Sequence, residues 1–197
     1  MSTPSIQACL SLDFHPVAVE TMTYAGVGSR STPQDQVNRI KVAAQRLRGM
    51  GYTLLSGGAM GADSAFEAGA GTDKQIFLPW ARFNGSESMF TKPSREAEQI
   101  AASVHPYWRN LSGITKLLMG RNSHQVLGAD LLHPVDFLVC WTPDGCESEE
   151  DRSSETGGTG QAIALACRNH IPVFNLARPG SGERLRDFLT NKGHDSL

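Results

Sequence analysis

Residues 52–70 read YTLLSGGAMGADSAFEAGA. The apolar run at 52–55 predicts a buried strand, and the chain then breaks at Ser56-Gly57-Gly58. A helical pattern follows, whose packed face is expected to contain Met60, Ala65, Phe66 and Ala68. The stretch therefore predicts a strand, a glycine turn and a helix in immediate succession.

Glycines at a strand-to-helix junction have two interpretations. They let the backbone approach a ligand closely, while the first N–H groups of the helix and the positive end of its dipole attract an anion such as phosphate. Alternatively, they only solve a packing problem in a tight turn. Residues 52–70 alone do not separate the two.

Two further stretches repeat this plan. An apolar strand at 23–27 is followed by Gly28-Ser29-Arg30, and another at 137–141 is followed, after a polar loop, by Gly157-Gly158-Thr159-Gly160. Open parallel sheets bind their ligands at the carboxyl ends of the strands. Three such turns favour a binding cleft over coincidental turn chemistry.

The whole chain alternates strands and helices. Strands are expected at 23–27, 52–55, 75–78, 136–141 and 171–176, and helices at 34–50, after the turn within 56–70, and at 94–104, 111–119, 160–169 and 183–190. This spacing indicates βαβ units with right-handed crossovers. We therefore expect an α/β fold of the Rossmann-like, doubly wound class, with a mainly parallel sheet and helices on both faces. Its domain is expected at 23–190, between a lead-in at 1–22 and a tail at 191–197.

Two segments interrupt the alternation. Residues 79–93 mix aromatic and polar groups without periodicity, which is typical of a lid or binding loop, or of a surface loop with an apolar anchor. Residues 120–130 form a dense polar cluster that suggests a site. Arg121 in this cluster is the best phosphate ligand, because a guanidinium binds an oxyanion bidentately; the alternative is a structural salt bridge, with Asp130 as its partner. His124 is expected to be a hydrogen-bonded structural residue.

Composition excludes several classes of protein. With 197 residues, 40% hydrophobic and 19% charged, the chain is an ordinary globular one, and its net charge of −2 disfavours a dedicated nucleic-acid coat. Its cysteines lack CxxC spacing and are expected to be reduced thiols without a metal: Cys9, Cys140, Cys146 and Cys167. No run is long enough to span a bilayer and no secretory leader pattern is present. We expect a cytoplasmic protein.

The turns also carry a family resemblance, which runs from about residue 23 to 176. Residues 27–30 and 55–63 resemble the first and second turns of the DNA-processing protein A (DprA/Smf) family, and Arg121-Asn122 is similar to its Arg-Asn motif. Residues 157–160 lie where LOG proteins carry a Gly-Gly-x-Gly-Thr turn. The chain thus resembles the SLOG superfamily, which implies a Rossmann-like domain, a cleft for nucleotides or nucleotide-derived ligands, and a homodimer or larger assembly.

The chain departs from both families. LOG phosphoribohydrolases carry a catalytic glutamate after the glycine turn, whereas this chain reads Gln161-Ala162-Ile163-Ala164. DprA proteins usually add a further domain and use a basic pocket. A binding protein is therefore favoured over an enzyme: a sensor, carrier or sequestering protein for a nucleotide, such as a signal of bacterial antiviral defence, in a bacterial or phage-infected cell.

The proposed cleft assigns roles to particular residues. Those expected to bind the ligand are Gly28, Ser29, Arg30, Ser56, Gly57, Gly58, Ala59, Asp63, Arg121, Asn122, Thr142, Gly157, Gly158, Thr159, Gly160 and Gln161. The candidates for stacking on a base are Trp80, Phe83, Trp108 and Trp141. No metal and no cofactor other than a nucleotide-type ligand is expected.

Two alternatives remain. An N-glycosidase or deoxyribosyltransferase needs a carboxylate close to the sugar, for which Asp63 and Glu67 are the candidates. A DprA-like recombination mediator would instead bind single-stranded DNA with an affinity that falls steeply with salt.

Overall fold

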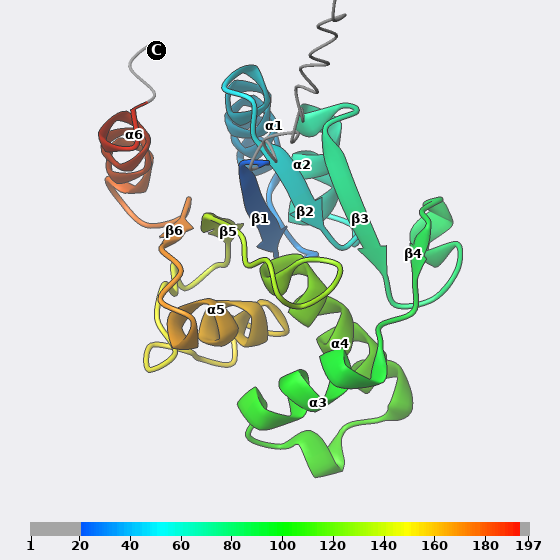
Figure 1. Cartoon of the computed structure of the whole chain (residues 1–197). Coiled ribbons are helices and arrows are strands. Elements are labelled where there is room, and N and C mark those ends of the chain that lie inside the picture. Colours follow the sequence, from blue (N-terminus) through cyan, green and yellow to red (C-terminus); the bar gives the residue numbers. More distant parts are fainter. Residues whose placement is uncertain (1–20, 194–197) are drawn as a thin grey trace, which may run out of the picture.

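A computed structural model describes residues 21–193 of the chain. It contains a six-stranded, entirely parallel sheet in the order β4-β3-β2-β1-β5-β6, with helices on both faces (Figure 1). The strands are β1 (Thr23–Gly28), β2 (Thr53–Ser56), β3 (Lys74–Leu78), β4 (Phe90–Thr91), β5 (Phe137–Trp141) and β6 (Val173–Asn175). The predicted doubly wound α/β class is confirmed.

Helices α1 (Gln34–Gly49), α2 (Ala62–Ala70) and α6 (Ser181–Asn191) cover one face of the sheet (Figure 1). Helix α1 is buried there through an apolar stripe of Ile40, Ala44 and Leu47. Tyr24 of β1 stacks on Phe137 of β5, with ring centroids 5.8 Å apart. Because these aromatic side chains lie between the sheet and the helices, they fix the central strands against this layer.

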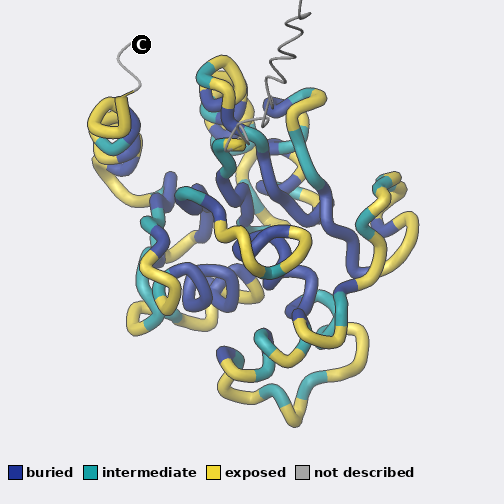
Figure 2. Tube along the Cα trace, viewed as in Figure 1, coloured by how far each residue is buried: buried dark blue, intermediate teal, exposed yellow. Residues whose placement is uncertain are grey.

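Helices α3 (Arg95–Val104), α4 (Gly113–Leu127) and α5 (Thr159–Arg168) cover the other face. Helix α3 begins after Ser94, the first residue of the helix predicted at 94–104, whose hydroxyl accepts a hydrogen bond from the N–H of Ala97 at 3.1 Å. Helix α5 is almost wholly buried (Figure 2), which explains its Ala-rich sequence. Short 3-10 turns at Phe83–Gly85 and Trp108–Asn110 complete the described chain.

The packed face of α2 differs from the predicted one. Ala65 and Phe66 are buried as expected, but Met60 and Ala68 are exposed. Gly69 takes the contact position instead, since a Cβ there would lie 2.4 Å from the carbonyl oxygen of Lys41 in α1. The two helices approach too closely for a side chain at this point.

Two segments carry more regular structure than the sequence suggested. The polar cluster at 120–130 is mostly the second half of α4, which runs unbroken to Leu127. Its polar residues are buried on several sides, so no amphipathic stripe marks them as helical. Residues 79–93 contain a 3-10 turn and the two-residue edge strand β4, which is too short to predict from a pattern.

The predicted lead-in and tail fall largely outside the described residues, as does Cys9. Within residues 21–193, no helix is long and apolar enough to cross a membrane.

Candidate functional site

A polar cavity of about 440 Å³ opens where the carboxyl end of β1 meets the segment after β5. The chain winds from β1 outward to β4 and then returns to the other side of β1 as β5, so this is the point at which the strand order reverses. The wall contains Gly28, Ser29, Arg30, Ala59, Asp63, Arg121, Asn122, Gly157, Gly158 and Thr159 from the predicted set. The structure therefore brings the three turns together with α4.

Asp63 and Arg121 form a buried ion pair in this wall. Arg121 Nη1 lies 3.2 Å from Asp63 Oδ2, and the two side chains are only 7% and 4% exposed. Asp63 also accepts hydrogen bonds from the N–H groups of Gly28 (3.2 Å) and Ala59 (3.4 Å). Burial raises the pKa of Asp63, while Arg121 and the two N–H donors oppose that shift. The carboxylate ties the β1 turn, the β2 turn and α4 together.

The guanidinium of Arg121 lies directly against the second turn. A Cβ on Gly57 would fall 1.3 Å from Arg121 Nη1, so only glycine fits beside it. Burial lowers the pKa of Arg121 despite the facing carboxylate, and the nearby charge of Arg30 adds to that shift. The predicted salt-bridge alternative for Arg121 is thus realised, but with the wrong partner named: Asp130 contacts His133 instead.

The turn before α5 is organised differently. Helix α5 begins at Thr159 after Gly158, whose φ of −64° is already helical. The N–H groups of Gly158 and Thr159 have no hydrogen-bond acceptor among residues 21–193. Asn122 Nδ2 donates to the carbonyl oxygen of Gly158 at 3.2 Å and so fixes the turn to α4. A helix N-terminus with free donors is thereby presented to the cavity.

Asp144 holds the loop that leads to this turn. Thr142 Oγ1 and Ser153 Oγ donate to its carboxylate at 2.7 and 2.6 Å, and the hydroxyl of Thr156 donates to it as well. Partial burial raises the pKa of Asp144, but the hydroxyl hydrogen bonds outweigh this and lower it to about 2. The carboxylate is therefore ionised at neutral pH and orders residues 142–156 from within.

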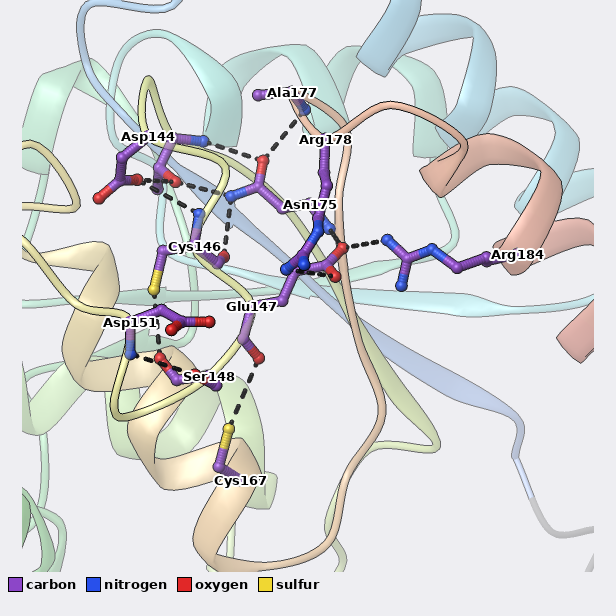
Figure 3. A network of polar contacts seen from close by, with 11 residues as sticks. Asp144, Cys146, Glu147, Ser148, Asp151, Cys167, Asn175, Ala177, Arg178 and Arg184 are labelled. Atoms are coloured by element: carbon purple, nitrogen blue, oxygen red, sulfur yellow. Dashed lines mark hydrogen bonds and ion pairs between the residues drawn. The ribbon is translucent and has the colours of Figure 1, made fainter.

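A second network fastens the same loop to β6 (Figure 3). Asn175 Nδ2 donates to the carbonyl oxygen of Cys146 at 2.9 Å. Glu147 pairs with Arg184 of α6 at 2.6 Å and accepts the N–H of Asn175 at 2.7 Å. The acidic run at 147–151 supplies structural ion pairs here through Glu147.

The two arginines of the cavity wall differ in whether they form an ion pair. Arg121 is neutralised by Asp63, whereas Arg30 is exposed and has no ion pair within the described part of the chain. Glu155 also lies in the wall and is exposed. Arg30 is thus the cation that is free to meet an anionic ligand.

Several predicted binding residues lie outside the wall. Ser56 donates its hydroxyl to the carbonyl oxygen of Gly26 at 2.6 Å, and Thr142 is occupied by Asp144 and Asn175. The turn glycines Gly58 and Gly160 face Leu78 and Arg152 rather than the cavity. These residues contact the surrounding protein and do not line the cavity.

The remaining candidates are also placed elsewhere in the described structure. Glu67 pairs with Lys74 at 2.9 Å, away from the cavity. Trp80 packs on Phe83, Trp108 lies under Lys116, and Trp141 is in the core. Gln161 is 2% exposed and outside the wall. None of these aromatic residues lies in the cavity wall, so base stacking by them stays a prediction.

Sequence reasoning missed Gln125, which lies in the wall one helical turn after Arg121. The four-residue spacing from Arg121 was the available signal, since it places both on one helix face. His124 beside it is structural, as predicted: its Nε2 accepts from the N–H of Ser94 at 3.3 Å, and Nδ1 donates to the carbonyl oxygen of Gly128 at 3.1 Å. No group of three or more metal-ligating side chains occurs in residues 21–193.

Comparison with known proteins identifies no family. No family model and no curated protein matches the chain. Two solved structures are similar at 16% identity, each over 88% of this chain: DNA processing protein A from Helicobacter pylori, which binds single-stranded DNA (73% of that chain, TM-score 0.46), and the Moco carrier protein of Chlamydomonas rheinhardtii (85% of that chain, TM-score 0.47). Likeness at this level concerns the path of the chain and assigns no ligand to the cavity.

Proposed function

We propose that this protein binds a small phosphate-bearing molecule, a nucleotide or nucleotide derivative, in the cavity between β1 and α5. One observation carries the proposal: the unpartnered N–H groups of Gly158 and Thr159 begin a buried helix at the wall of a cavity that also contains the uncommitted cation Arg30. Donors at a helix N-terminus and a free guanidinium both favour a phosphate oxyanion.

The volume of the cavity supports a ligand larger than phosphate. About 440 Å³ lies within the range of roughly 300–1,000 Å³ that small-molecule sites occupy. The wall contains polar residues such as Arg30 and Gly158 as well as the apolar residues Val27, Met119 and Ala162. A phosphate ester with a planar organic part matches both kinds of lining.

Binding without turnover is favoured by the contacts of the two carboxylates that were predicted as catalytic candidates, Asp63 and Glu67. Asp63 already accepts from Arg121 and two backbone N–H groups, so its oxygens are committed to the protein rather than directed at a ligand. The second catalytic candidate, Glu67, is paired with Lys74 outside the wall. A role as carrier, sensor or sequestering protein requires only the binding that the cavity offers.

The substitution Gly158→Asp tests the proposal. It places a carboxylate among the phosphate donors, so ribose 5-phosphate and adenosine monophosphate, measured by isothermal titration calorimetry, should bind at least about tenfold more weakly. The fold should not suffer, because Gly158 has a φ of −64° that any residue adopts and a Cβ there meets only the flexible end of Met119 at 3.3 Å. Gly182→Asp, in the exposed first turn of α6, is the matched control.

The outcomes separate the alternatives. Equal affinity of wild type and Gly158→Asp for both phosphates would refute the cavity assignment. Release of free base from the nucleotide, lost in Asp63→Asn, would instead favour the N-glycosidase. Single-stranded DNA binding that falls steeply with salt would favour the DprA-like mediator. Native mass spectrometry of the protein purified from cells would name a retained ligand and so test the narrower expectation of a signalling nucleotide.

A further inference from the structure

Gln125 is a fully buried amide with nothing to bind. Its side chain is 0% exposed, it lies in the wall of the proposed cavity, and both Oε1 and Nε2 lack a hydrogen-bond partner among the described residues. Its neighbours on α4 each have a hydrogen-bond partner, although Arg121 Nε has none among the described residues. Asn122 donates to Gly158, and Arg121 is paired with Asp63.

An amide in this position is unfavourable in the empty protein. Buried polar side chains are nearly always hydrogen-bonded, because an unmade bond forfeits the hydration that the group had in the unfolded chain. An apolar residue of similar length, such as methionine, would fill the same space on a helix without that penalty. Gln161 of α5 is equally unpaired but lies outside the wall, whereas Gln125 lines the cavity, where a bound ligand would satisfy its amide.

The polar groups of the wall differ in how far they are exposed to solvent. Arg30 and Gly158 are exposed, whereas Gln125 is fully buried. A phosphate held by the exposed groups would leave the rest of its molecule to extend inward, past Met119 and Ala162 in the same wall. Apolar and thioether groups of this kind pack well against a flat ring.

We propose that Gln125 determines the specificity of the site by pairing with an edge of the ligand that carries a hydrogen-bond donor and an acceptor side by side. A primary amide presents one donor and one acceptor, and it pairs bidentately with such an edge. Purine and pyrimidine bases carry edges of this kind, and ribose 5-phosphate does not. The inference rests on the proposed function and narrows its ligand to a phosphate ester of a nucleobase-type heterocycle.

The substitution Gln125→Met tests this role. Isothermal titration calorimetry would compare ribose 5-phosphate with the 5′-monophosphates of adenosine, guanosine, cytidine and uridine. In the wild type, at least one nucleotide should bind about tenfold or more tightly than ribose 5-phosphate. In Gln125→Met this ratio should fall to about one, while the affinity for ribose 5-phosphate stays unchanged and the melting temperature of the free protein rises.

Controls make each result decisive. Gln45→Met, on the exposed face of α1, should change neither the ratio nor the melting temperature. Gln125→Glu keeps a polar group but replaces the donor with an acceptor, so the preferred base should change to one whose edge offers donors. This second variant gives a reading even if Gln125→Met fails to fold.

Four results would overturn the inference. An undiminished ratio in Gln125→Met, or an unchanged base preference in Gln125→Glu, would mean that ordered water alone satisfies the amide. A wild type that binds nucleotides no better than ribose 5-phosphate would remove the base-recognition role but leave the proposed function intact. Absence of binding to ribose 5-phosphate and to every nucleotide would refute the proposed function, and the inference with it.

Discussion

The turn after β2 and the turn before α5 look alike in sequence but are opposite in structure. At residues 56–61 the space beside the glycines is filled by the protein itself: Arg121 occupies the position of a side chain on Gly57, and Asp63 accepts the N–H of Ala59. At residues 157–159 the space is open. No atom lies within 4 Å of a Cβ on Gly157, and the N–H groups of Gly158 and Thr159 are free within the described chain.

The difference shows that the role of a glycine-rich turn depends on what fills the space beside its glycines. We call the turn at residues 56–61 the closed turn and the turn at residues 157–159 the open turn. The packing interpretation of the glycines describes the turn after β2, whereas the ligand-binding interpretation stays a prediction for the turn before α5. In the closed turn, glycine admits an internal guanidinium, and the ion pair braces the cavity. In the open turn, the same kind of sequence leaves a helix N-terminus available to an external anion.

The largest expected effect comes from breaking the brace of the closed turn. Arg121→Met leaves Asp63 buried without its cation, which should lower the free energy of unfolding by about 3–5 kcal/mol in urea titrations. Asp63→Leu combined with Arg121→Met removes both charges and should recover part of that loss. Lys74→Met breaks the more exposed pair with Glu67 and should cost less than about 1 kcal/mol. Equal losses in Arg121→Met and Lys74→Met would contradict the bracing role.

The second largest effect should come from adding a methyl group to each turn, because the closed turn should lose more stability than the open one. Gly57→Ala forces Arg121 out of its position and should destabilise the protein by about 3 kcal/mol, the upper end for overpacking. Gly158→Ala meets only the flexible end of Met119 at 3.3 Å and has a helical φ, so its change should stay within about 0.5 kcal/mol. Thermal and urea unfolding measure both; the opposite ranking would refute the distinction between closed and open turns.

A smaller effect should come from the loop that supports the open turn. The pKa of Asp144 is lowered from 3.8 to about 2 in the folded chain, so its ionised form stabilises the fold above pH 4 and this contribution fades as the pH falls from 4 towards 2. Because Asp144 is exposed, we expect Asp144→Asn to cost only about 1 kcal/mol at pH 7.

The pH dependence of that difference is the control. Urea titrations at pH 7, 4 and 2 should show wild type and Asp144→Asn converging as the carboxylate is protonated. A difference that stays constant down to pH 2 would assign the loss to the changed side chain rather than to its charge.

The fold was largely predictable because its signals are local. The stripe of Ile40, Ala44 and Leu47 and the apolar run of β5 each reveal their element without reference to the rest of the chain. The edge strand β4 was missed because two residues carry no period. The second half of α4 was missed because a helix buried on several sides shows no polar face.

The site was predictable only in outline. Gly28, Asp63 and Gly158 were expected at the cleft because strand ends converge at one edge of a parallel sheet. Arg121 was expected there because it lies in a polar cluster and its guanidinium suits an oxyanion. Arg121 and Asp63 lie 58 positions apart in the sequence, so no local sequence pattern indicates that they pair. Gln125 was overlooked because it stands out only by the missing hydrogen bonds of its buried amide, which the sequence does not reveal.

The seam between β1 and β5 joins segments that are distant along the chain: the N–H of Thr23 donates to Asp136 Oδ2, 113 positions away. Loop closure over such a distance is slow, so this pairing should form late, after the local unit from β1 to β3. The cavity straddles the seam and is complete only once it has closed. A bound ligand should therefore slow the unfolding of the chain while leaving its folding rate unchanged.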